Sequence, residues 1–261
     1  MEHFDLQRGD CFELLQAIDD ESIDLTVTSP PYYNAREYSQ YESLEDYMNT
    51  MEKIFSLVFH KTKESRIVAI NISPVIVPRE SRSKQSYRIP LPYYYVPMME
   101  KIGFEFLEDI IWRKPDGSAI NRNGGFFRHR KPLAYKPNIV TEYLLVFKKP
   151  SSRLIDKFLK NDSLVGDGYE RTNVWDVNPE TSSQHSAPFP VEIPRKLIQY
   201  YSYEKDVVLD PFMGSGTTGV ACSGLDRAFI GMEQDQTYFE LATERIGYDK
   251  YLNWKELFCA G

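Results

Sequence analysis

The chain has 261 residues, of which 42% are hydrophobic and 26% are charged, and its formal net charge is −7. These values are ordinary for a globular protein, and no apolar run approaches the roughly 20 residues that a membrane-spanning helix needs. The polar, acidic start of the chain does not fit a signal peptide. Cys11, Cys222 and Cys259 lack CxxC spacing. We therefore expect no disulfide framework, no metal site and a cytoplasmic location.

The charge is distributed unevenly along the chain. Residues 1–60 carry 3 basic and 13 acidic side chains, residues 61–200 carry 23 and 15, and residues 201–261 carry 5 and 10, giving −10, +8 and −5. Within the middle part, residues 113–136 hold seven basic side chains against Asp116 alone. Such a patch attracts a polyanion whatever the total charge is, although a solvated basic loop would have the same composition.

Short apolar runs alternate with helix-like stretches, which is typical of parallel βαβ units in a single α/β domain over residues 1–261. We expect strands at Leu25–Thr28, Ile67–Ile72, Phe106–Trp112, Tyr143–Phe147, Val207–Leu209 and Ala228–Ile230. We expect helices at Cys11–Ile18, Leu44–Lys61, Tyr93–Ile102, Pro194–Tyr201, Thr217–Ser223 and Gln236–Ile246. In the second of these helices the apolar positions keep the 3/4 spacing of one buried face, and Ser43 precedes it as a capping residue.

Two stretches do not fit this alternation. Residues 115–137 are rich in Gly, Asn, Arg and aromatic side chains, and residues 150–186 contain Gly166, Gly168 and many polar residues. Long irregular connections in a compact domain are usually functional or disordered. We therefore expect substrate-reading insertions at these two places.

The first motif that carries chemistry is Ser29-Pro30-Pro31-Tyr32, which directly follows an apolar strand. Two consecutive prolines fix φ and remove two backbone donors, so the loop is stiff and its carbonyls remain free acceptors. The Ser29 hydroxyl and the Pro30 carbonyl can each accept one N–H of an amine and turn its lone pair toward an electrophile. Tyr32 offers a flat ring for stacking a base. Taken alone, the same residues would also suit a plain diproline turn.

The second motif is Asp206–Thr218, an apolar strand that ends in Asp210 and runs into a Gly-rich turn and a helix. Gly214 and Gly216 allow the backbone to come close to a ligand at the carboxyl edge of a sheet. The turn is not a phosphate loop, because no Lys lies near it, and the third glycine of GxGxxG is missing. Seventeen residues after Gly216, a second short strand ends in Glu233, where Rossmann-like sites commonly hold ribose hydroxyls. This pattern alone predicts a nucleotide-like cofactor.

Together the two motifs resemble those of the amino-methyltransferase family of DNA modification enzymes. Ser29–Tyr32 is similar to the family's [DNS]-P-P-[YFW] catalytic motif, and Asp210–Thr218 to its cofactor motif. The catalytic motif comes first here, which is the circularly permuted order of the β group. Weaker landmarks also agree: Gly9-Asp10 with Leu14-Leu15, the segment Ala187–Pro190, and the pair Ile111–Pro115 and Glu142–Lys149. The resemblance spans nearly the whole chain.

The resemblance implies a Rossmann-like, mostly parallel seven-stranded sheet with one antiparallel strand, and S-adenosylmethionine as the cofactor. It implies direct attack of a base amine on the methyl sulfonium, with the target nucleotide flipped out of the duplex. The residues implied to be catalytic are Ser29, Pro30, Pro31 and Tyr32. Those implied to bind the cofactor are Asp10, Pro188, Phe189, Asp210, Phe212, Gly214, Gly216, Thr217 and Glu233.

The expected partner is double-stranded DNA. We place its recognition in the two insertions, because their side chains include types that read guanine and adenine edges or contact phosphates. The candidate residues are Asn121, Arg122, Asn123, Arg128, His129, Arg130 and Lys131. The family also allows for a homodimer and for a cognate restriction endonuclease as a genetic partner.

Ser29 bears on the choice of base. In the family, Ser at this motif position goes mostly with N4-cytosine enzymes, and Asp or Asn with N6-adenine enzymes. Cytosine N4 is therefore the predicted target, with adenine N6 as the alternative. Methylation of RNA or of a protein glutamine is a further alternative, which the Ser variant and the permuted motif order disfavour. A methyltransferase-like protein that binds without turnover is another, which the two intact motifs disfavour.

Overall fold

The computed structural model describes residues 4–34, 41–79, 81, 84–118, 130, 132–133, 135, 137–152, 165–166, 168–179 and 189–247. Its centre is a twisted eight-stranded sheet in the order β1-β10-β9-β2-β3-β7-β6-β8, with a separate β4-β5 ribbon. The strands are β1 Phe4–Arg8, β2 Ile23–Thr28, β3 Thr62–Ile72, β4 Val75–Val77, β5 Tyr87–Ile89, β6 Glu105–Arg113, β7 Thr141–Lys148, β8 Val174–Asp176, β9 Val207–Asp210 and β10 Ala228–Glu233.

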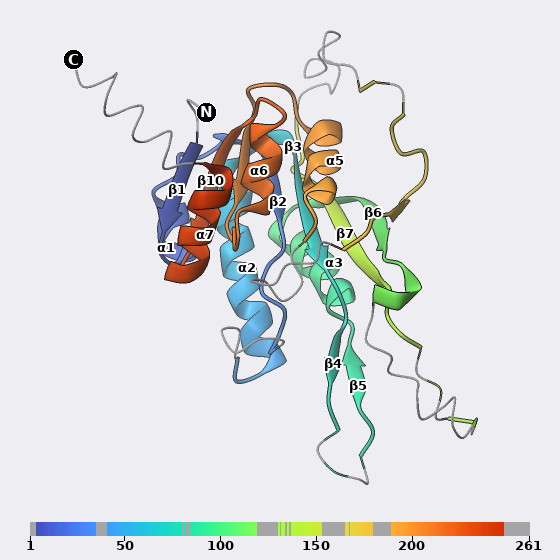
Figure 1. Ribbon diagram of the computed structural model, residues 1–261. Helices are drawn as coiled ribbons and strands as arrows, with labels where there is room; N and C mark the ends of the chain where they lie inside the picture. The colour runs from blue at the N-terminus through green and yellow to red at the C-terminus, as the bar shows by residue number, and fades with distance from the viewer. Residues whose placement is uncertain are drawn as a thin grey trace, which may run out of the picture.

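Helices cover both faces of the sheet, so the domain has three layers (Figure 1). The helices are α1 Cys11–Gln16, α2 Leu44–Lys61, α3 Leu91–Ile102, α5 Glu192–Tyr201, α6 Thr217–Ser223 and α7 Gln236–Ile246, with a short 3-10 turn at Asp116–Ser118. In β3, Ile67 and Ala69 pack toward α5, α6 and α7, while Val68 and Ile70 pack toward α1, α2 and α3. This alternation follows from the two-residue period of a strand.

The predicted fold class is confirmed. All pairings in the large sheet are parallel except those of β7, which runs antiparallel to both β3 and β6. The described sheet has eight strands rather than seven, because the short β8 pairs with β6 inside the predicted 150–186 insertion. The sequence patterns placed α2, α6 and α7 at their observed bounds but missed β1, β4, β5 and β8. No helix in the described part is long and apolar enough to cross a membrane.

Since the neighbouring strands run the same way, the carboxyl ends of β2, β3, β9 and β10 meet at one edge of the sheet. From this edge the β4–β5 ribbon continues beyond β3 and projects away from the body of the domain (Figure 1). The predicted insertion 115–137 begins just after β6 ends at this edge and precedes β7. Most of its residues lie outside the described part. The carboxyl edge is therefore where sites on this fold are expected.

The opposite end of the sheet is held by a buried ionic network. Arg66 of β3 contacts Asp24 of β2 at 3.0 Å and Asp206, just before β9, at 2.9 Å. Asp24 also pairs with Lys63 at 2.8 Å and accepts the backbone N–H of Val207 at 3.0 Å. Both carboxylates are buried, so the guanidinium compensates two charges that water does not reach.

Arg66→Met should therefore lower the free energy of unfolding by about 3 kcal/mol or more, because it leaves two buried carboxylates without their shared cation. Lys101→Met is the matched control: its ion pair with Glu52 is formed by a side chain that is 69% exposed, against 17% for Arg66. The control should cost less than about 1 kcal/mol. Urea denaturation of both variants measures the difference, and similar losses would contradict this role of Arg66.

Candidate active site

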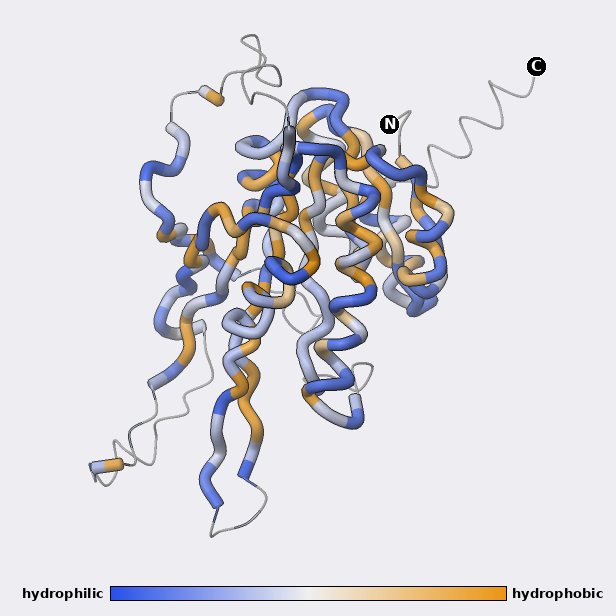
Figure 2. The backbone as a smooth tube through the Cα atoms, turned by 180° about the vertical axis from the view of Figure 1, so that it is seen from behind, coloured by the Kyte–Doolittle hydropathy of each residue, from blue (hydrophilic) through white to orange (hydrophobic). Residues whose placement is uncertain are grey.

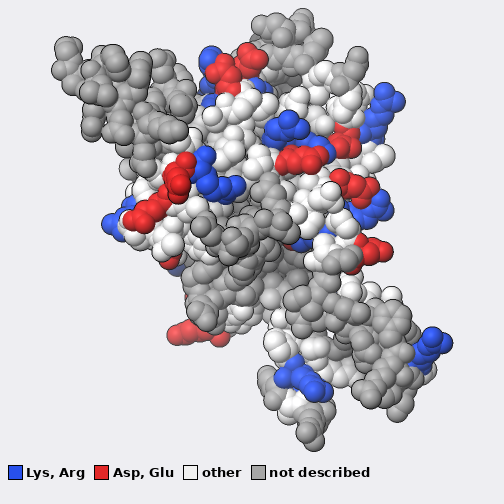
Figure 3. Space-filling model, in the orientation of Figure 1, with Lys and Arg blue, Asp and Glu red and all other residues white. Residues whose placement is uncertain are grey.

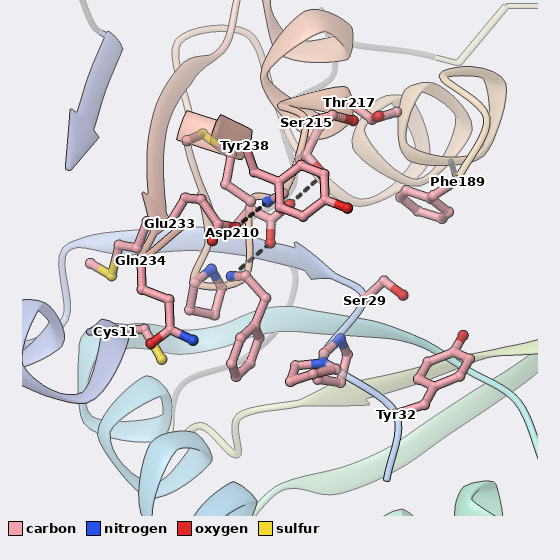
Figure 4. A pocket seen from close by; sticks show the side chains of 18 of the residues that line it. Cys11, Ser29, Tyr32, Phe189, Asp210, Ser215, Thr217, Glu233, Gln234 and Tyr238 are labelled. Carbon is pink, nitrogen blue, oxygen red and sulfur yellow. Dashed lines mark hydrogen bonds between the residues drawn. The ribbon is translucent and has the colours of Figure 1, made fainter. Parts of the chain in front are cut away.

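One cavity of about 380 Å³ opens at the carboxyl edge and joins the two sequence motifs. Ser29, Pro30, Pro31 and Tyr32 after β2 form one wall, and the turn from Asp210 to Thr218 after β9 forms another (Figure 4). Glu233, at the end of β10, completes the rim together with Asp10 from the β1–α1 connection. The parallel order of the strands thus brings together loops that lie far apart in the sequence.

Asp210 joins the two motifs directly. Its carboxylate accepts hydrogen bonds of 2.7 Å from both the Thr28 and the Thr218 hydroxyl, and one of 3.1 Å from the Phe212 backbone N–H. Burial raises the pKa of Asp210 to about 6, although these hydrogen bonds favour the charged form; the nearby charge of Glu233 also raises it. At neutral pH the carboxylate is an anion beside the cavity, and its oxygens are already engaged by protein donors.

The Gly-rich turn is shaped by two left-handed glycines with different surroundings. Gly214, at φ +52°, lines the cavity, and a Cβ there would approach nothing closer than 4.0 Å. Gly216, at φ +78°, does not line the cavity; a Cβ there would lie 2.9 Å from Ala242 Cβ on α7. Gly214 therefore leaves room for a ligand, whereas Gly216 is required for close packing of the turn against α7.

Glu233 is held in place by the turns on either side of it. Its carboxylate accepts the Gly214 backbone N–H at 2.9 Å and the Asp235 backbone N–H at 2.8 Å, and its pKa is raised by partial burial. The Gly9 backbone N–H donates to the Glu233 carbonyl at 3.0 Å, which fixes the start of α1 beside it. There the Asp10 side chain caps α1 by accepting the Phe12 N–H at 2.8 Å.

The remaining residues predicted to bind the cofactor either line the cavity or lie outside the described part of the chain. Phe189, Phe212 and Thr217 line the same cavity, whereas Pro188 lies outside the described residues. Cys11 also lines the cavity, but burial raises the pKa of its thiol to about 12, so it is not a thiolate nucleophile at neutral pH. The described residues contain no group of His, Cys, Asp and Glu that could hold a metal ion.

A polar network behind the Ser29–Tyr32 loop was not predicted from the sequence. The side-chain amide of Asn71, on β3, donates to Glu142 at 2.9 Å, to the Tyr32 hydroxyl at 3.2 Å and to Ser29 Oγ at 3.3 Å. The Tyr32 hydroxyl in turn donates to Glu142 at 2.9 Å. Burial, and secondly the charge of Glu142, hold the pKa of Tyr32 well above its usual value, so the phenol stays neutral and acts as a donor.

Glu142 also forms an ion pair with Lys114, and the Lys114 ammonium lies 4.5 Å from the centre of the Trp112 ring. Trp112, Lys114 and Glu142 all line the cavity on the side of Tyr32. They come from the end of β6 and the start of β7. The sequence analysis noted the segments Ile111–Pro115 and Glu142–Lys149 only for their resemblance to the family and assigned them no role in the site. Lys114 and Glu142 are charged residues at the ends of apolar strands, which is a pattern that can indicate a site. The sequence alone did not show which end of each strand lies at the cavity.

Of the predicted DNA-contacting residues, only Arg130 is described. It is exposed, has φ +47° and does not line the cavity. The others lie outside the described residues: Asn121, Arg122, Asn123, Arg128, His129 and Lys131.

Comparison with known proteins shows which family this chain resembles. The family described as DNA methylase, N6_N4_Mtase, matches residues 23–244. The type II β methyltransferase M.BslI of Bacillus sp. (strain NEB-606) is 35% identical over an alignment of 253 residues, and the match covers 92% of this chain and 27% of that protein. The type II methyltransferase M.ScaI of Streptomyces caespitosus is 30% identical over 92% of this chain and 80% of its own length.

A solved structure shares the fold over nearly the whole chain. TTHA0409 of Thermus thermophilus, described as a candidate DNA modification methylase, was crystallised with S-adenosyl-L-methionine. It superposes with a TM-score of 0.76 at 27% identity and covers 94% of both chains.

We expect the Asp210 carboxyl to titrate at about pH 6 in the ligand-free protein. Because this lies above the usual value of 3.8, its ionisation lowers stability as the pH rises from about 4 to about 6. Thr28→Val removes a donor to the charged form and should raise the pKa further. Carbon-13 NMR of the side-chain carboxyls measures both. Thr243→Val, which loses only a bond to the Phe239 carbonyl, is the control; an unchanged Asp210 titration in Thr28→Val would contradict the coupling.

Proposed function

The chain belongs to the N6/N4 DNA methylase family, and we propose that it transfers a methyl group from S-adenosylmethionine to the exocyclic N4 amine of a cytosine flipped out of duplex DNA. The observation that carries the proposal is the single cavity shared by Ser29–Tyr32 and the Asp210–Thr218 turn. A donor and an acceptor of a methyl group must meet in one such space, because direct transfer requires the reacting atoms to be in contact.

The residues of the second motif fit S-adenosylmethionine, the cofactor of this family. Gly214 leaves the turn open to a ligand, and the Glu233 oxygens, each holding one backbone N–H, keep lone pairs for the ribose hydroxyls. Asp210 and Glu233 surround this part of the cavity with negative charge, which complements a cation. When bound, the cofactor supplies an electrophilic methyl group on a positively charged sulfur.

The Ser29–Tyr32 loop would orient the acceptor amine. Ser29 Oγ and the Pro30 carbonyl each accept one N–H, so the nitrogen lone pair points toward the methyl group. Asn71 holds the Ser29 hydroxyl in place through its amide N–H. The raised pKa of the Cys11 thiol agrees with direct transfer without a covalent enzyme–base intermediate.

The Tyr32 side of the cavity would hold the flipped base. Stacking on an aromatic ring contributes about 1–3 kcal/mol per base, which offsets the few kcal/mol of unstacking. The hydrogen bond from the Tyr32 hydroxyl to Glu142 fixes the ring plane, and the ion pair with Lys114 fixes Glu142. The Lys114 ammonium carries three N–H groups, so beside its ion pair with Glu142 it can donate to acceptor atoms on the base edge.

The choice of cytosine N4 depends on Ser29, since Ser at this motif position goes mostly with N4-cytosine enzymes. M.BslI and M.ScaI are named type II methyltransferases. We extend that assignment to this chain and place it in a type II restriction–modification system with a cognate endonuclease as genetic partner. The basic insertion that contains Arg130 would read the recognition sequence.

The proposal is tested by methylating plasmid DNA with the purified protein and identifying the modified nucleosides by mass spectrometry. We expect N4-methylcytosine, and Ser29→Ala should lower kcat by roughly 10- to 100-fold while cofactor affinity is retained, because one acceptor is lost at the reacting amine. N6-methyladenine without N4-methylcytosine would contradict the choice of base. Transfer to RNA or protein but not to DNA would contradict the substrate class.

Two substitutions at Tyr32 separate the ring from its hydroxyl. Tyr32→Ala removes the stacking surface and should lower kcat/KM by about 10- to 100-fold. Tyr32→Phe keeps the ring and loses the hydrogen bonds of the hydroxyl with Glu142 and Asn71, so it should cost about tenfold or less. Steady-state kinetics with DNA as the varied substrate measures both. Equal losses in the two variants would mean that the hydroxyl, and not the ring, carries the effect.

A further inference from the structure

The β4–β5 hairpin has no role in the chemistry described so far. It leaves the sheet directly after β3, at the edge where the active-site cavity opens, and extends away from the domain (Figure 1). Its strands pair antiparallel, with Val75 opposite Ile89 and Val77 opposite Tyr87. None of its described residues lines the active-site cavity. A projecting ribbon beside an active site is suited to contacts with a large substrate.

The base of the hairpin is fixed to the domain. Val75 and Ile89 are buried in the hydrophobic cluster that includes α2 and α3. The Arg88 guanidinium donates to the Pro137 carbonyl at 2.6 Å, and Pro137 ends the basic insertion before β7. The ribbon is therefore attached both to the core and to the end of the segment in which DNA recognition was expected.

The outer part of the hairpin is basic and polar. Residues 79–88 contain Arg79, Arg82, Lys84 and Arg88 against Glu80 alone, together with three serines. Arg79 and Lys84 are exposed, and the Tyr87 side chain is 61% exposed. Figure 2 shows the far end of the ribbon as hydrophilic, and the atoms of its described part that are visible in Figure 3 are blue or white. Arg, Lys, Ser and Tyr are among the side chains that contact DNA phosphates.

A second hollow, of about 410 Å³, connects the hairpin to the catalytic loop. It is lined by Tyr33 and Asn34, which directly follow Tyr32, and by residues of both hairpin strands and Tyr94 of α3. The hollow thus places the hairpin beside the residues that directly follow Tyr32.

We propose that the β4–β5 hairpin is a docking arm for duplex DNA, which holds the sugar–phosphate backbone beside the flipped-out nucleotide. The inference rests on the proposed function and adds a substrate-binding element to it. Arg79 and Lys84 contact phosphates, and Tyr87 supports them with its hydroxyl. A two-stranded ribbon is also narrow enough to lie along a DNA groove. Phosphate contacts of this kind position the duplex and carry no sequence information themselves.

The double variant Arg79→Ala/Lys84→Ala tests the arm. The affinity for a labelled duplex oligonucleotide is measured by fluorescence anisotropy. Near 0.1 M salt it should fall by roughly tenfold for each lost contact. The slope of log K against log salt concentration should fall by about 1.8, since each phosphate contact contributes about 0.9. Affinity for S-adenosylmethionine, measured by calorimetry, should stay unchanged, and the charge-preserving variant Arg79→Lys/Lys84→Arg should bind DNA almost as the wild type does.

The matched control is Lys53→Ala/Lys205→Ala, which removes two exposed lysines on α2 and at the opposite edge of the sheet. If the Arg79→Ala/Lys84→Ala variant kept the wild-type DNA affinity and salt slope, the hairpin would not be a docking arm. An equal loss of DNA affinity in the control variant would also contradict the proposal. Methyl transfer to DNA is measured with the same samples. A wild-type protein that transfers no methyl group to DNA would overturn the proposed function, whereas an active wild type with unaffected hairpin variants would overturn the arm alone.

Discussion

The pair of hydrogen bonds from Thr28 and Thr218 to the Asp210 carboxylate is the constraint on which the site depends. The ladder between β2 and β9 pairs only Leu25 with Val208 and Thr26 with Leu209, so it stops before the strands end. Beyond that point, side chains hold the two carboxyl ends together. Because Ser29 follows Thr28 directly, the same bonds set the distance between the Ser29–Tyr32 loop and the Gly-rich turn.

This arrangement also explains the uneven charge of the sequence. The two acidic ends of the chain fold next to each other as β1, β10 and β9, and their acidic residues Asp10, Asp210, Glu233 and Asp235 line one half of the cavity. The basic middle of the chain supplies Lys114, which lines the Tyr32 side of the cavity in an ion pair with Glu142, and the β4–β5 hairpin beyond it. The acidic half of the cavity therefore suits a cation, and because the basic side chains are concentrated in the middle of the chain, a net charge of −7 does not argue against DNA as a substrate.

The sequence predicted those parts of the fold and site that local patterns determine. The 3/4 spacing of α2 and the strand-turn-helix pattern around Asp210 are local, and the structure has both elements where they were expected. The three-residue strands β4, β5 and β8 were missed because so few residues show no reliable two-residue period. Asn71 was missed for another reason: it lies inside an apolar strand, and its bond to Ser29 depends on the β2–β3 register.

The reversed direction of β7 decides which residues reach the Tyr32 side of the cavity. In a parallel strand, Glu142 near the start of β7 would lie at the amino edge, far from the loops after β2 and β9. Because β7 runs antiparallel to β3 and β6, its first residues lie at the carboxyl edge, with Tyr143 opposite Ile72 and Thr141 opposite Arg113. Glu142 can then contact Lys114, Asn71 and Tyr32 at once. The single antiparallel strand thus supplies the carboxylate that fixes the Tyr32 ring, which a fully parallel sheet with the same sequence order could not do.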